Sequence, residues 1–321
     1  MNRPLAFAAA LLVAAISVSS ACMAGPLPDT INFELKPSFH AGTLQLALTE
    51  DGKGRHHNVS GSDYSPRDLP GLDYAAFTGG NRTPIGFALV REAGRVDCAG
   101  TGSRSYATGA CHFTADPGFS DFLAGRGIAR PDREEAFALT MVSAKRGLVE
   151  TLAANSYPKP SIDDLTALSA LDVTQTYISS LASHGFRPKD LDELTEFAAL
   201  DITPEYIEEL RRGGFTNLDA DEIVQFKALE ITPQLVASLA AAGYPKLTPD
   251  ELTQFAALKI TPQFIAGFRN AGFTNLDVDT LVQLKALDIT PEFVQSLKAR
   301  GLNPKSADQL VHLKIGIDGD N

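Results

Sequence analysis

Few side chains in this sequence stand at a spacing that supports catalysis or metal binding. His56 and His57 are adjacent, but no cysteine or carboxylate pair at ligand spacing accompanies them, so we expect no metal site there. The fragments DGKG at Asp51 and DGDN at Asp318 do not continue to the acidic twelfth position of a calcium loop. There is no Gly-x-Ser-x-Gly elbow and no nucleophilic cysteine matched with a histidine base. The sequence therefore predicts a protein that is not an enzyme and holds no metal or other cofactor.

The two cysteines of a predicted hairpin have the clearest expected chemistry. The stretch RVDCAGTGSRSYATGACHF has the pattern of two strands joined by a loop rich in Gly and Ser. A turn centred between Arg104 and Ser105 places Cys98 opposite Cys111, where a cross-strand disulfide is geometrically feasible. A redox-active pair is the alternative, but the twelve intervening residues differ from a Cys-x-x-Cys motif. We expect a structural disulfide.

The N-terminus has the pattern of a secretory signal. A positive charge precedes the uncharged apolar stretch Leu5–Val18, and small residues follow it. The stretch is shorter than the about 20 residues that a membrane-crossing helix needs. Cleavage after Ala24 would remove Cys22 and leave an even pair of cysteines in an oxidising compartment. A lipoprotein anchored through Cys22 is the less favoured alternative, because Ser19 stands where Leu is usual. We expect residues 1–24 to be a signal peptide and the mature chain to be periplasmic.

The formal net charge of −11 is spread unevenly along the chain. Residues 144–321 carry 25 acidic side chains against 16 basic ones. An acidic surface repels phosphate backbones, so nucleic acid is not an expected partner. After the N-terminal stretch, no segment is apolar over a membrane-spanning length, and the mature chain is not expected to cross a membrane.

From Val173 onward the sequence repeats with a period of 29 residues. Each repeat opens on an aliphatic residue that is followed by Thr and, in four of the five repeats, by Pro. A glycine stands twelve residues after the opening residue. Thr can cap a helix that Pro begins, and Gly can end it in the left-handed conformation. The opening residues are Val173, Ile202, Ile231, Ile260 and Ile289.

The second half of each repeat has a helix start of its own. Asp, Thr or Ser stands three residues before Glu, Thr or Gln, and four of the five pairs match a capping box. Apolar residues follow at helical spacing. Each repeat is therefore expected to form two short antiparallel helices, and the stacked repeats to form an α-solenoid-like array. The capping pairs are Asp190 with Glu193, Asp219 with Glu222, Thr248 with Glu251, Asp277 with Thr280, and Ser306 with Gln309.

Before the array the sequence alternates between apolar and polar residues, as in TINFELKPSF. We expect an antiparallel β domain at residues 26–140, in which residues 51–83 are mostly loop. A degraded first helical repeat is expected at 141–172, five repeats at 173–317 and a tail at 318–321. The expected fold class is α+β, with the β domain before the helices.

Several stretches resemble a known family. They are ITPEYIEELRRGGF and LDADEIVQFKAL in the array, FALVREAGRVDCAGTG in the hairpin, and REEAFALTMVSA between them. Together they are similar to the extracytoplasmic C-terminal region of bacterial membrane zinc metallopeptidases of the β-lactam-sensor (antirepressor) type, and to stand-alone exported proteins with that module. The peptidase motif His-Glu-x-x-His is not in this sequence. The cysteine pair also departs from the usual hairpin of that family. The resemblance implies a sensing or interaction module without its enzyme.

We therefore expect a non-catalytic exported protein whose repeat surface binds another envelope protein or senses a signal. The first helix of the Ile202 repeat has charged side chains that are not needed to cap the helix or to pack it, so they could contact a partner. The alternative is a small-ligand sensor or an enzyme with its site in the 51–83 segment, since long loops on a sheet often carry function. The candidate interaction residues are Glu205, Glu208, Glu209, Arg211 and Arg212.

Overall fold

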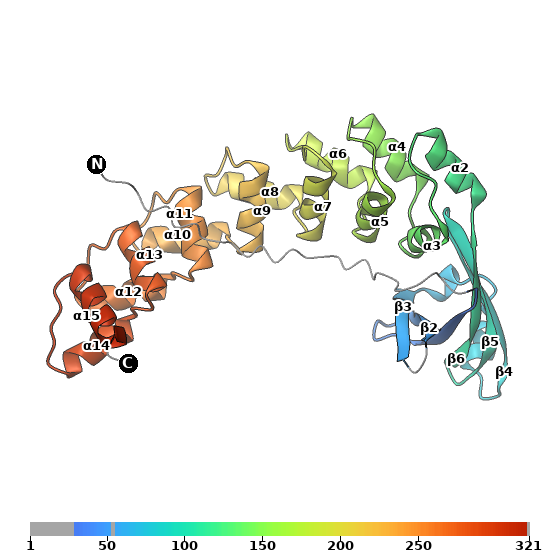
Figure 1. Cartoon of the computed structure of the whole chain (residues 1–321), viewed down its shortest axis with the longest axis horizontal. Helices are drawn as coiled ribbons and strands as arrows, with labels where there is room; N and C mark the ends of the chain where they lie inside the picture. The colour runs from blue at the N-terminus through green and yellow to red at the C-terminus, as the bar shows by residue number, and fades with distance from the viewer. Residues whose placement is uncertain (1–28, 53–54, 320–321) are drawn as a thin grey trace. The chain divides into compact units, whose positions relative to one another are not determined.

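The computed structural model describes residues 29–52 and 55–319, and it has the α+β class expected from the sequence (Figure 1). The expected signal peptide, with Cys22, lies outside the described residues, as does the end of the tail. The chain divides into two compact parts. The N-terminal part runs to Ser179 and includes Lys189–Ala199, and the C-terminal part comprises Ser180–Pro188 and the chain from Leu200 onward. Each part is described by itself.

The N-terminal part contains a six-stranded antiparallel sheet (Figure 1). Its strand order is β3-β2-β1-β6-β5-β4, so hairpins β1–β2–β3 and β4–β5–β6 meet where β1 pairs with β6. The strands are β1 (Ile31–Pro37), β2 (Leu44–Gly52), β3 (Arg55–Tyr64), β4 (Thr83–Val90), β5 (Gly94–Ser103) and β6 (Tyr106–Ala115).

One face of this sheet is buried, as the alternating sequence predicts. Along β1, Ile31, Phe33 and Leu35 are buried and the intervening residues are half-buried. The short helix α1 (Tyr74–Thr78) contributes Phe77 to this core, and Phe137 packs edge to face on Phe113 with ring centroids 5.3 Å apart. Burial of these apolar side chains is the main term that stabilises the sheet.

The segment 51–83 is not mostly loop, in contrast to our expectation. It contains the last two residues of β2, all of β3, the 3-10 turn η1 (Pro66–Asp68), α1 and the first residue of β4. The sequence Arg55–Tyr64 lacks apolar alternation, and β3 is an edge strand that pairs with β2 along one side only. Its backbone hydrogen bonds, not its apolar residues, define it as a strand.

The predicted disulfide between Cys98 and Cys111 is present. The two residues face each other across β5 and β6, and the turn lies at Arg104 and Ser105, both with positive φ. Cys98 is 4 % exposed and Cys111 is fully buried. The bridge is therefore part of the sheet core.

The helical region follows the 29-residue period. Helix α2 comes after β6, and all but the last of the helices from α2 onward have nine residues. The helices are α2 (Pro117–Gly125), α3 (Arg133–Met141), α4 (Arg146–Ala154), α5 (Ile162–Ala170), α6 (Gln175–Ser183), α7 (Leu191–Ala199), α8 (Pro204–Arg212), α9 (Ala220–Ala228), α10 (Pro233–Ala241), α11 (Pro249–Ala257), α12 (Pro262–Asn270), α13 (Val278–Ala286), α14 (Pro291–Ala299) and α15 (Ala307–Gly319).

The helix starts and ends use the predicted residues. In the Ile202 repeat, the Thr203 hydroxyl accepts from the amide of Tyr206 and Pro204 is the first helical residue. Gly214 then adopts φ of 101° after the helix. Asp219 and Glu222 form the reciprocal capping box at the start of α9. The corresponding pair at the start of α15 differs, because Gln309 reaches the amide of Lys305, one residue before the cap.

A repeat that the sequence did not reveal begins at Ala115. Asp116 caps α2 through the amide of Phe119 (2.6 Å), Pro117 begins it, and Gly127 follows it with φ of 71°. The sheet therefore ends at Ala115, whereas we expected the β domain to reach residue 140. Asp replaces Thr as the cap, and the opening aliphatic residue is only Ala, so the pattern is weak although the backbone follows it.

The residue before each repeat from Ala144 onward also marks the period. Although none of these residues is glycine, each has φ between 51° and 57°. The amide that follows closes the preceding helix, as when Val173 donates to Leu168 O (2.9 Å). The left-handed conformation costs a non-glycine residue about 1–2 kcal/mol. Its recurrence indicates that the hydrogen bond closing each helix requires this backbone conformation. The residues are Ser143, Asp172, Asp201, Glu230, Lys259 and Asp288.

Candidate functional site

The candidate residues of α8 divide into two groups. Glu205, Glu209 and Arg212 are exposed, whereas Glu208 and Arg211 are half-buried. The amide of Glu205 itself, followed by the Thr203 hydroxyl, lowers the pKa of the Glu205 carboxyl. The three exposed side chains are therefore accessible to a partner.

Arg211 has a structural role that the sequence did not reveal. Its guanidinium donates to the carbonyl of His184 (2.8 Å) and to Glu208 Oε1 (2.6 Å). The same link recurs in later repeats, where Arg269 donates to Ala242 O (2.7 Å) and Lys298 to Ala271 O (2.8 Å). Each cation satisfies a carbonyl at the C-terminal end of the first helix in the preceding repeat, where positive charge is favoured. These cations therefore join successive repeats.

A second recurring contact lies inside a repeat. Lys227 Nζ lies 4.7 Å from the centroid of the Tyr206 ring, and the Tyr206 hydroxyl donates to Ile231 O (3.4 Å). Burial raises the pKa of Tyr206 to about 12. Lys285 and Phe264 form the equivalent pair at 4.9 Å. An aromatic residue four positions after the opening residue and a lysine 21 positions later thus fill the space between the two helices.

The most regular exposed feature is a set of aspartates at the second position of the second helix in each repeat from Ala144 onward. All six are exposed, and none of their carboxylates bonds to another described residue. In the C-terminal part, α9, α11, α13 and α15 are consecutive neighbours, so four of these aspartates follow one another from helix to helix, each at the second position of its helix. We call the six residues the aspartate row. They are Asp163, Asp192, Asp221, Asp250, Asp279 and Asp308.

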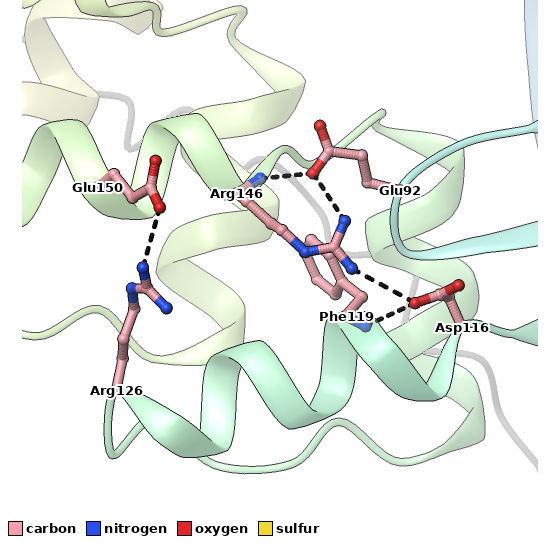
Figure 2. A network of polar contacts seen from close by, with 6 residues as sticks. All are labelled: Glu92, Asp116, Phe119, Arg126, Arg146 and Glu150. Carbon is pink, nitrogen blue, oxygen red and sulfur yellow. Dashed lines mark hydrogen bonds and ion pairs between the residues drawn. The ribbon is translucent and has the colours of Figure 1, made fainter.

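Arg146 connects the β4–β5 turn with the helices in the N-terminal part (Figure 2). Glu92 Oε2, from the turn, accepts from the Arg146 amide (2.9 Å) and from its guanidinium (3.3 Å). The guanidinium also reaches Asp116 Oδ1 (3.4 Å), the cap of α2, and lies 5.2 Å from the centre of the Phe119 ring. Because the residue before α4 is Lys145, which provides no side-chain cap, Glu92 serves as the cap from a distant part of the sequence.

We expect Glu92→Ala to lower the free energy of unfolding by about 1 kcal/mol, because it removes the only side-chain cap on α4 among the described residues. The measurement is chemical denaturation followed by circular dichroism. Glu150→Ala is the control, since Glu150 pairs only with Arg126 at an exposed site and its loss should cost about 0–0.5 kcal/mol. Equal effects of the two substitutions would show that Glu92 is not a cap.

The N-terminal part also has a depression of about 600 Å³ beside this network. Asp68, Arg91, Glu92 and Lys145 contribute charged groups to it, and Arg91 Nε donates to Ser143 Oγ (2.7 Å). Asp68 is its contribution from the 51–83 segment. The depression contains both acidic and basic side chains, and two of them, Arg91 and Glu92, already bond to Ser143 and Arg146. The depression therefore does not by itself indicate a reaction.

The remaining residues that the sequence suggested for metal binding give no site in the part of the chain that the structure describes. The side chains of His56 and His57 and the DGDN segment lie outside what the structure describes at side-chain level. Within the described residues, no three His, Cys, Asp or Glu side chains are grouped so as to hold a metal ion. No described helix combines the length and apolar character needed to cross a membrane.

The fold and the surface together define a helix-repeat protein preceded by a disulfide-linked antiparallel sheet. No family model, curated protein or solved structure matches the chain.

Proposed function

We propose that this protein is a non-catalytic, exported binding protein whose aspartate row holds a basic segment of another envelope protein. The observation that carries the proposal is the recurrence of an exposed aspartate, without an internal bond to any described residue, in all six repeats from Ala144 onward. An acidic residue in a first helical turn gains about 0.3–1 kcal/mol from the helix dipole. That gain does not require aspartate at every repeat, because glutamate would obtain it equally.

The electrostatics of the array support a cationic partner. Its excess of acidic side chains adds to the field of the row, and extended repeat surfaces commonly serve as binding faces. Charge complementarity of this kind increases the association rate and selects the partner, and added salt weakens it. We therefore expect the bound segment to be rich in Lys and Arg and its affinity to fall as salt rises.

Export agrees with the disulfide, because such bonds persist in oxidising compartments. A periplasmic location and removal of residues 1–24 are part of the proposal. So is a relation to the sensor module of the membrane metallopeptidases, which would place this protein among partners in the cell envelope.

The test compares proteins captured from periplasmic extract by the mature chain and by two quadruple variants. Asp221→Asn, Asp250→Asn, Asp279→Asn and Asp308→Asn together remove four charges of the row, and we expect them to abolish capture of a basic protein. The matched control also removes four exposed charges of the C-terminal part, and it includes two candidate residues of α8. It combines Glu205→Gln, Glu209→Gln, Glu230→Gln and Glu292→Gln.

The control variant should retain the partner, and high salt should release the partner from both the control and the unmodified chain. Thermal unfolding checks that both variants are folded. Unchanged capture by the aspartate variant, or loss of capture in the control alone, would disprove the proposed role of the row.

A further inference from the structure

A cavity in the N-terminal part lies where other repeats place an aromatic ring. It has a volume of about 260 Å³, and Leu148 and Ser169 are among the residues that line it. In the Ala144 repeat these two residues occupy the positions of Tyr206 and Lys227 in the Ile202 repeat. Since Leu and Ser are shorter than Tyr and Lys, the space between the helices is left open.

The polar groups around the cavity lack the partners that the other repeats supply. Ser169 Oγ is buried and has no hydrogen-bond partner within the protein, which is unfavourable for a polar group. Val173 lines the cavity at the position equivalent to Ile231, whose carbonyl accepts from the Tyr206 hydroxyl. A ring with a hydroxyl group would therefore find an acceptor and a donor already in place.

The charge at the cavity favours an anion. Lys145 lines it, its ammonium has no bonded partner among the described residues, and the helices α4 and α6 both begin there. Helix N-termini carry partial positive charge that favours a carboxylate, and at α4 the Arg146 amide is already occupied by Glu92. Asp172 is the one acidic residue in the lining, and it is exposed. Lys145 and the start of α6 therefore supply positive charge against the single carboxylate in the lining.

From these observations we propose that this cavity binds a small aromatic carboxylate, with its ring in the place that Tyr206 occupies in its own repeat and its carboxylate toward Lys145 and the helix starts. The volume of about 260 Å³ lies just below the range of about 300–1,000 Å³ seen for small-molecule sites, which restricts the ligand to a single small ring. No residue of the aspartate row lines the cavity, so this proposal and the proposed function can be tested independently.

Calorimetric titration of the mature, disulfide-linked chain with 4-hydroxybenzoate tests the proposal. We expect the unmodified protein to bind this probe and Leu148→Tyr to lose binding, because the new ring would fill the cavity as Tyr206 fills its equivalent. Lys145→Gln should weaken binding by about tenfold, which corresponds to about 1.4 kcal/mol. Leu235→Tyr places the same side chain at the same position of the Ile231 repeat and should leave the affinity unchanged.

A second obstructing variant guards against misfolding of Leu148→Tyr. Gly147 lines the cavity, and a Cβ atom there would meet no other atom within 4 Å. Gly147→Gln should therefore fold and should also reduce binding, since Gln is the residue at this position in the Ile231 and Ile260 repeats. No binding to the unmodified chain, or undiminished affinity in both obstructed variants, would overturn the site. Unchanged affinity in Lys145→Gln would overturn the carboxylate assignment.

Discussion

Phe226→Ala is expected to destabilise the C-terminal part by about 3–5 kcal/mol, the usual cost of removing a buried aromatic ring. Phe226 is fully buried and packs edge to face on Phe215, with ring centroids 5.3 Å apart. Its loss would leave a cavity between helices that are each too short to be stable alone. Chemical denaturation followed by circular dichroism should show a lower midpoint.

Two further substitutions separate the loss of packing from other effects of the change. Phe226→Leu should cost less than the alanine substitution, because Leu168 and Leu284 occupy the same position in other repeats. Phe39→Ala makes the same chemical change at a fully exposed ring and should have almost no effect. If Phe226→Ala were as mild as Phe39→Ala, the array would not depend on burial between neighbouring helices.

The helical repeats could be predicted because their signals are local. Thr203, Pro204 and Gly214 act within one helix, so their spacing reveals the helix start and end without tertiary information. The register of the cysteine hairpin was also predictable, since Cys98 and Cys111 are equally far from the turn. In each case the residues that define the element lie within it.

Three features were not predicted from the sequence. Two of them depend on contacts between different elements, and the third is a repeat whose sequence pattern is weak. The strand β3 is defined by its backbone pairing with β2, and its sequence does not alternate. The repeat at Ala115 keeps its cap at Asp116 but has an inconspicuous opening residue. The cap that Glu92 provides for α4 joins residues 54 apart in the sequence, so no local pattern indicates it.

The candidate site was predicted only in part. Exposure of Glu205, Glu209 and Arg212 agrees with the sequence, whereas Arg211 bonds to a carbonyl of the preceding repeat. The aspartate row was visible as one column of the aligned repeats, but its lack of bonded partners among the described residues required the structure. The cavity beside Ser169 likewise follows from comparing side-chain sizes between repeats once their packing is known.

Loss of the disulfide is the second large expected effect. Replacing Cys98 and Cys111 together with alanine should lower the free energy of unfolding of the N-terminal part by about 3 kcal/mol in the chain-entropy model for a loop of this length. The reason is that the bridge restricts the unfolded chain. The measurement is thermal or chemical unfolding of the mature protein.

Reduction of the unmodified chain provides an independent check. Because both cysteines are buried in the sheet core, the bond should resist mild reductant while the protein is folded and become reducible as it unfolds. The double variant should show no change in stability with reductant. Two free thiols in the unreduced mature protein, measured by mass spectrometry, would contradict the predicted bridge.

Site-specific photo-crosslinking in periplasm tests the central claim most directly. A photoreactive residue in place of Gln254 lies one helical turn after Asp250 on the same exposed side of α11, whereas one in place of Gln234 lies on the first helix of that repeat. The proposed function predicts a salt-sensitive adduct with a basic protein from position 254 and little or none from position 234. An adduct from position 234 alone, or none from either position, would contradict binding along the aspartate row.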